Sequence, residues 1–164
     1  MQPVRHTIGP MKKPPAPLRL LMCCTLFLAG CNSYNRDVIS VGLSVELNGI
    51  KRAEDGTVTV AWNMVNPNVT SYLLSRVSNK VFLNGKLVGT TVDANPMAVP
   101  AQQTVGKVSK LTLAGPGAER LIAEAAAHGR AAYRVDSQLI ILLYSDVTEK
   151  GALTHAGSVL VTGK

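Results

Sequence analysis

Residues 81–89 read Val-Phe-Leu-Asn-Gly-Lys-Leu-Val-Gly, and this stretch decides the fold class of the chain. Asn84-Gly85 is the strongest short signal for a β-hairpin, because both positions tolerate a positive φ. Apolar residues line one side of residues 71–83, and residues 86–92 return from the turn with a second strand-like pattern. The sequence therefore predicts two antiparallel strands joined by a two-residue turn.

The same period of two continues towards the N-terminus. Residues 41–48 and 57–64 alternate apolar with polar or small residues, and a Glu-Asp-Gly turn at 54–56 separates them. Asn66, Pro67 and Asn68 end the second of these strands, since proline donates no backbone hydrogen bond and asparagine suits turns. We expect a second hairpin here, with the single Trp62 at the centre of the core.

Towards the C-terminus the pattern changes once. Residues 93–102 carry two prolines and are predicted to form an edge-running loop, and residues 103–113 a fifth strand. The alanine-rich stretch after residues 115–117 (Gly-Pro-Gly) has helical spacing, and Gly129 is placed to end it. A sixth strand follows from Ala131, and a last strand covers about 152–162. The apolar run 139–143 predicts a strand buried on both faces, with a lipid-facing strand as the alternative.

Together these elements predict a mainly β domain over residues 38–164. The expected architecture is an immunoglobulin/fibronectin type III-like antiparallel β-sandwich of about seven strands, with one short helix between the fifth and sixth strands. The sequence shows no heptad repeat and no low-complexity tract. We therefore expect a single domain.

The first 30 residues have the zones of a secretory signal. Basic residues precede an apolar run at 20–28, which is shorter than the roughly 20 residues that a membrane-spanning helix needs. The run closes in Leu28-Ala29-Gly30-Cys31, which resembles a bacterial lipobox. An ordinary secretory signal or a short membrane anchor are the alternatives. We interpret residues 1–30 as a signal peptide, for which Met11 is a more typical start than Met1.

The resemblance to bacterial lipoproteins implies that Cys31 becomes the first mature residue and carries a diacylglyceryl group and an N-acyl chain such as palmitate. Two or three acyl chains hold a protein firmly, whereas one binds only marginally. Residues 31–37 are then a lipidated tether. Position 32 is Asn, not the Asp that favours inner-membrane retention in enteric-type sorting. We expect the periplasmic face of the outer membrane in preference to the inner membrane.

Charge and cysteine content limit the function classes. Four of the 17 basic residues and none of the 10 acidic residues lie in the leader, so the net charge falls from +7 to about +3 in the 134 mature residues. The remaining cations are scattered, and we expect no nucleic-acid partner. The mature domain has no thiol besides Cys31, which leaves none for a disulfide, a metal or a nucleophile.

Four pieces of the mature chain, taken in order between Val41 and Val161, resemble the late embryogenesis abundant type 2 family, also called the water-stress and hypersensitive-response domain. They are the strand into Asn66-Pro67-Asn68, the hairpin at 81–89, the proline-bearing loop with the strand to Leu113, and residues 129–135 around Tyr133. One departure is visible at residues 136–138, Asp-Ser-Gln, near which the family often has a glycine.

This resemblance implies a β-sandwich without enzymatic activity that is associated with dehydration or other stress and stabilises proteins or membranes. The chain is 46% hydrophobic and 16% charged, so it should fold unaided, unlike the disordered proteins that share the name.

No set of residues predicts catalysis or a cofactor. His128 and His155 lack an obvious third partner for a metal, and the pairs Glu54/Asp55 and Asp146/Glu149 flank turns. Ser78 and Ser137 have no nucleophile-elbow context, and the Gly-Pro-Gly at 115–117 is not a phosphate loop. We therefore expect no enzyme, no bound metal and no cofactor other than the covalent lipid.

Two functions remain open. The first is a non-catalytic envelope lipoprotein that contacts envelope proteins or lipids and protects against desiccation or other stress. The alternative is a periplasmic carrier of an apolar ligand, such as a lipid held between the sheets or beside the helix. An enzymatic function would need a cleft with convergent polar groups. The oligomeric state is not predicted.

Overall fold

The computed structural model describes residues 42–144 and 147–163. It contains nine strands and one helix in this part of the chain. The predicted leader, Cys31 and the tether lie outside the described residues. The elements are β1 (Ser44–Arg52), β2 (Val58–Asn66), β3 (Tyr72–Leu83), β4 (Lys86–Asp93), β5 (Met97–Val99), β6 (Gln103–Lys110), β7 (Thr112–Leu113), α2 (Pro116–His128), β8 (Arg130–Tyr144) and β9 (Val147–Gly163).

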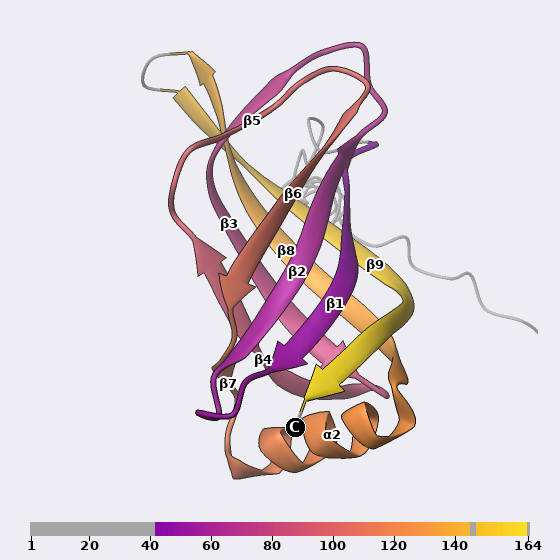
Figure 1. Cartoon of the computed structure of the whole chain (residues 1–164). Helices are drawn as coiled ribbons and strands as arrows, with labels where there is room; N and C mark the ends of the chain where they lie inside the picture. Colours follow the sequence, from indigo (N-terminus) through magenta and orange to yellow (C-terminus); the bar gives the residue numbers. More distant parts are fainter. Residues whose placement is uncertain (1–41, 145–146, 164) are drawn as a thin grey trace, which may run out of the picture. The chain divides into compact units, whose positions relative to one another are not determined.

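The strands form one continuous sheet in the order β6-β2-β1-β9-β8-β3-β4-β7, with β5 added beside β3. The sheet curls around its own apolar face, and α2 lies across one end of it (Figure 1). The predicted fold class, mainly β with one helix after the fifth predicted strand, is confirmed. No helix among the described residues has the length and apolar content needed to cross a bilayer.

The core lies on the inner face of the curled sheet. In β2 the side chains of Val58, Val60, Trp62 and Met64 are buried and alternate with half-buried neighbours. This alternation follows from the pleat of a strand, which turns successive side chains to opposite faces. Trp62 is 1% exposed, as expected for the centre of the core, and its indole N–H donates to Ser109 Oγ at 3.0 Å.

The central hairpin forms as predicted. Asn84 and Gly85 have φ values of 48° and 78°, and β3 and β4 pair antiparallel from the turn outwards. The helix also agrees with the sequence. It ends at His128, and Gly129 follows with φ 74°, the left-handed conformation that glycine adopts without strain. Ala118, Ile122 and Ala125 turn towards the core.

Two of the predicted segments are divided differently in the structure. The predicted loop at 93–102 contains β5, which pairs with β3. The predicted fifth strand breaks at Leu111, since β6 pairs with β2 at one edge of the sheet while β7 pairs with β4 at the other. Leu111 lies between them, 3% exposed, with its N–H bonded to Val58 O. The strand count is therefore nine and not seven.

The pairing of β1 with β9 is parallel, which differs from the all-antiparallel arrangement that we expected. It covers Gly49–Arg52 against Leu160–Gly163. The last strand also begins earlier than predicted, at Val147, and runs antiparallel beside β8. This parallel pair joins the two layers of the expected sandwich into one curled sheet, because it links the strands from the two halves of the chain by hydrogen bonds.

The apolar run at 139–143 has different environments on its two faces. Leu139 and Ile141 are each 1% exposed and belong to the core. Ile140 and Leu142 are half-buried on the outer face, where they pair with Arg76 and Leu73 of β3.

Candidate functional site at the β2–β3 junction

The junction between β2 and β3 is held by the side chain of Asn66, which is 1% exposed. Its Nδ2 lies 2.9 Å from Thr70 O, 3.2 Å from Val99 O and 3.0 Å from Pro100 O, so the amide group donates into a ring of three carbonyls. Its Oδ1 accepts the N–H of Asn68 at 3.0 Å. Burying an amide is favourable only when its hydrogen bonds are made, and here both ends of the amide group are bonded.

These bonds connect segments that are far apart in the sequence. Asn66 reaches from the end of β2 to the β5–β6 connection, and Gln102 N donates back to Asn68 O at 3.0 Å. Ser71 Oγ accepts the N–H of Ala101 at 3.0 Å. The two connections therefore form one rigid unit at the end of the sheet away from α2 (Figure 1).

Asn68 also contacts the first described residue of the chain. A Cβ at Gly42 would lie 2.9 Å from Asn68 Oδ1, and Gly42 has φ +94°. Both facts require glycine, because other residues strain at this φ and would collide with the amide. The Asn66-Pro67-Asn68 triplet thus ends β2, fixes the β5–β6 connection and contacts the point where the chain enters the domain.

No model of a known protein family matches the sequence, and no curated protein matches it. Several solved structures have a similar fold. A protein from Archaeoglobus fulgidus is 17% identical, with 72% of this chain and 96% of that chain covered and a TM-score of 0.46. AT1g01470 from Arabidopsis thaliana is 15% identical, with 73% and 78% covered and a TM-score of 0.48. At2g46140.1, named as a late embryogenesis abundant protein, is 10% identical, with 89% and 86% covered and a TM-score of 0.44. These similarities concern the course of the backbone.

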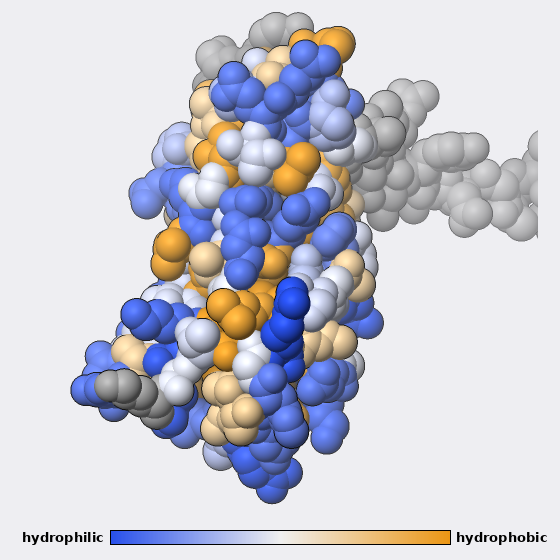
Figure 2. Space-filling model, turned by 45° about the vertical axis from the view of Figure 1, so that its right-hand side comes forward, coloured by the Kyte–Doolittle hydropathy of each residue, from blue (hydrophilic) through white to orange (hydrophobic). Residues whose placement is uncertain are grey.

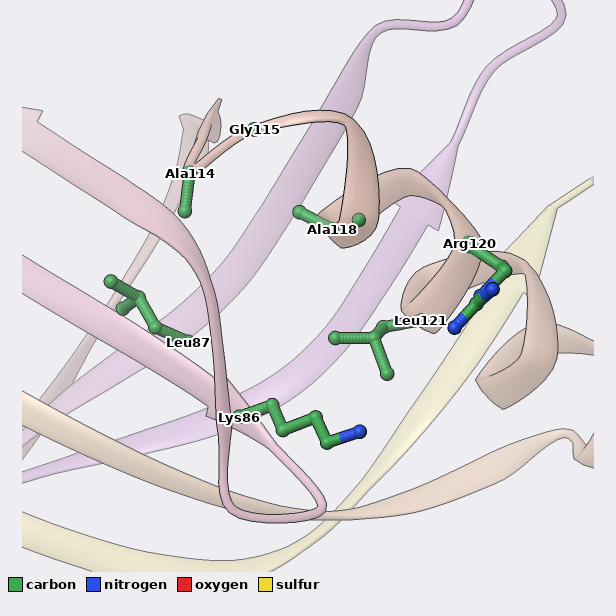
Figure 3. Close-up of a pocket in the computed structure, with 8 residues that line it drawn as sticks. Lys86, Leu87, Ala114, Gly115, Ala118, Arg120 and Leu121 are labelled. Carbon is green, nitrogen blue, oxygen red and sulfur yellow. The ribbon is translucent and has the colours of Figure 1, made fainter.

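A surface hollow of about 340 Å³ lies between α2 and the β3–β4 turn. Its apolar part is formed by Leu87, which is 41% exposed, and by the half-buried Leu121. Figure 3 shows Lys86 extending from the β3–β4 turn towards α2 beside Leu121, with Arg120 on the helix above it. Arg120 pairs with Glu124 at 3.4 Å. This hollow thus combines a small apolar floor with two cations.

The two histidines of the domain lie in different environments. His128 is exposed in the last turn of α2, where a cation suits the helix dipole. His155 is on β9, and its Nδ1 lies 2.9 Å from the hydroxyl of Tyr133. That hydroxyl also accepts the N–H of Leu47 at 3.2 Å, on the part of β1 that β9 does not pair with. Tyr133 therefore bridges the opening where β1 and β9 diverge.

Ser137 belongs to a buried polar row that sequence analysis did not identify. Its Oγ donates to Asn79 Oδ1 at 2.7 Å, and Asn79 Nδ2 donates to Thr91 Oγ1 at 3.1 Å. All three residues are at most 2% exposed and face the core from β8, β3 and β4. The signal in the sequence was three polar residues at positions where the period of two predicts apolar ones.

The other residues that the sequence offered for catalysis or metal binding do not come together in one site. Asp55 closes its own turn by accepting the N–H of Thr57 at 2.8 Å, and this bond lowers the pKa of the Asp55 carboxyl. Ser78 faces the outer side of β3, and Asp146 lies outside the described residues. Within residues 42–144 and 147–163, no three histidine, cysteine or acidic side chains gather as a metal site would require.

We predict that Tyr133→Phe lowers the free energy of unfolding by about 1–2 kcal/mol at pH 7, because Leu47 N–H and His155 lose their shared partner. Burial raises the pKa of Tyr133. The native phenol therefore contributes stability below its unfolded pKa of about 10, and this contribution declines as the pH rises towards the folded value.

Urea denaturation of both proteins at pH 7 and at pH 10.5 measures this effect, and the difference between them should shrink at the higher pH. Tyr72→Phe, at the half-buried start of β3, is the matched control and should change stability little at either pH. An equal loss in the two variants would show that the hydroxyl of Tyr133 is not special.

Proposed function

We propose that this chain is a non-catalytic envelope lipoprotein of the late embryogenesis abundant type 2 kind, held at a membrane surface by lipid on Cys31. Its domain acts by contact with envelope proteins or lipids and protects them during drying or other stress. The observation that carries the proposal is the lipobox-like Leu28-Ala29-Gly30-Cys31, followed by a mainly β domain whose first strand begins at Ser44.

The use of polar groups within the domain supports a role in binding rather than in chemistry. Asn66, Asn79, Ser137 and Tyr133 direct their polar atoms into hydrogen bonds that hold strands together. A catalytic site instead directs several polar groups at one hollow where a substrate would lie. Figure 2 shows a face on which small apolar areas are separated by polar ones, as on a solvated surface.

The anchor is tested by Cys31→Ser in cells that are fed a labelled fatty acid. We expect the variant to lose the label, to keep its leader and to leave the outer-membrane fraction. Cys24→Ser, inside the leader, is the matched control and should be processed and labelled as the native chain is. Retention of the label in Cys31→Ser would refute the anchor.

The stress role is tested separately by deleting the gene and drying the cells. We expect reduced survival and leakage of envelope contents, with rescue by the native gene and no rescue by Cys31→Ser. Unchanged survival would remove protection from the proposal and leave the anchored binding module.

The hollow beside α2 is the observation that favours the alternative function, a carrier of an apolar ligand. Leu87 and Leu121 could contact a short acyl segment while Lys86 neutralises an anionic head group. Native mass spectrometry of the acylated protein, released gently from cells, tests it. A bound lipid that is lost in Leu121→Asp and kept in Val108→Asp would support the carrier function.

A further inference from the structure

The two connections at the β2–β3 junction are free of charge. Residues 60–75 and 94–106 contain no Asp, Glu, Lys, Arg or His, although the chain as a whole is 16% charged. The hydrogen bonds of Asn66 and the bond from Gln102 N to Asn68 O bring these two uncharged stretches together at one end of the sheet. That end is opposite α2 (Figure 1).

The end of the sheet near α2 is charged instead. The end of β1 and the loop after it, the start of β4 and the helix itself supply cations and anions, and most of these side chains are exposed. They are Lys51, Arg52, Glu54, Asp55, Lys86, Glu119, Arg120 and Glu124. At the end opposite α2 the described charges lie on the β8–β9 hairpin, where Glu149 and Lys150 pair with Ile141 and Ile140. The β2–β3 and β5–β6 connections carry none, so a low-dielectric surface would accept them without burying a charge of their own.

Val69 stands at the end opposite α2 with 84% of its surface exposed. It lies in the β2–β3 connection, whose two flanks are fixed by the bonds of Asn66 to Thr70 O and to Asn68 N. The rigid connection thus holds an apolar side chain out into its surroundings. Transfer of such a side chain from water to an apolar phase lowers the free energy. It costs little further loop entropy, because the connection is already held in place.

The chain also enters the domain at this end. Gly42 contacts Asn68, and ten residues lie between it and Cys31, which makes eleven Cα–Cα steps. A fully extended chain of that length spans at most about 40 Å, so an anchor at Cys31 keeps this end of the domain close to the lipid surface. At such short range a weak contact is strengthened by its high effective concentration.

We propose that the β2–β3 connection, with Val69 foremost, rests on the lipid surface in which Cys31 is anchored. The proposal builds on the proposed function, because it requires the acylated Cys31. The bilayer interface provides the matching chemistry: Val69 reaches the acyl boundary while Thr70, Ser71 and Gln102 meet the head groups. The charged α2 end then points away from the membrane towards its partners.

The test uses the acylated mature protein in vesicles of phosphatidylethanolamine and phosphatidylglycerol. Cys31 is consumed by lipid, so Val69→Cys supplies the only thiol for a polarity-sensitive dye. Val108→Cys on β6 is the matched control, since this valine is 70% exposed and the same dye carries the same apolar driving force. Leu87→Cys reports on the opposite end. Flotation shows for each sample whether the protein is anchored.

With the protein anchored, we expect the dye at position 69 to shift to the blue and to be quenched several-fold by brominated lipid tails, and the dyes at 108 and 87 to be unaffected. Equal quenching at all three positions would overturn the proposal, as would no quenching at position 69. A blue shift at 69 without lipid quenching would indicate a protein contact and overturn it too. Failure to float would refute the anchor and with it both proposals, whereas flotation without quenching at 69 would refute this one alone.

Discussion

Asn66→Asp should cost about 3–5 kcal/mol of folding free energy at pH 7, the range for an uncompensated buried charge. The native amide points its NH₂ group at three backbone carbonyls, from Thr70, Val99 and Pro100. A carboxylate of the same shape would place negative charge against those three oxygens and would lose both donors. A domain of this size is stable by about 5–15 kcal/mol, so the variant should be close to unfolding at room temperature.

The pH dependence of this variant shows whether the loss of stability comes from the charge of the carboxylate or from a change in side-chain shape. Burial and the facing carbonyls raise the pKa of the introduced carboxyl above its unfolded value of about 3.9. The deficit relative to the native chain should therefore be smallest below about pH 4 and grow as the pH rises. Urea denaturation at pH 4 and pH 7 measures it. Asn48→Asp at an exposed position is the control, and a similar loss in both variants would contradict the assignment of a buried network to Asn66.

Trp62→Ala should destabilise the domain by a comparable amount, about 3–5 kcal/mol, as large-to-small changes in a core do. Trp62 is among the largest fully buried side chains and lies on the inner face of β2, at the level of Leu47 on β1 and Lys107 on β6. Its removal leaves a cavity that β2 and its two paired neighbours, β1 and β6, cannot fill. The midpoint of urea denaturation should fall with little change in slope.

Two further variants separate the volume of Trp62 from its hydrogen bond. Trp62→Phe keeps most of the apolar volume and should lose less than the alanine variant. Ser109→Ala removes only the acceptor of the indole N–H, which lies 3.0 Å away, and should cost about 1 kcal/mol. If Ser109→Ala were as damaging as Trp62→Ala, the hydrogen bond and not packing would be the main contribution.

The candidate site shows which of its features can be predicted from the sequence and which cannot. The sequence alone marks the end of a strand at Asn66, Pro67 and Asn68. Proline donates no backbone hydrogen bond, and asparagine favours turns. That Asn66 is buried, and that its partners come from residues 70, 99 and 100, depends on the pairing of β5 with β3. That Ser137 joins a buried row with Asn79 and Thr91 depends on the strand register, which the sequence alone does not give.

By itself, the sequence determined the elements that depend on neighbouring residues. The alternation of β2, the positive φ at Asn84-Gly85 and the left-handed cap at Gly129 are all local preferences, and each appears in the structure where it was predicted. Only the tertiary structure decided the parallel pairing of β1 with β9, the crossing at Leu111 and the bridge from Tyr133 to Leu47. These features join residues distant along the chain, and local patterns carry no information about which distant strand a given edge will meet.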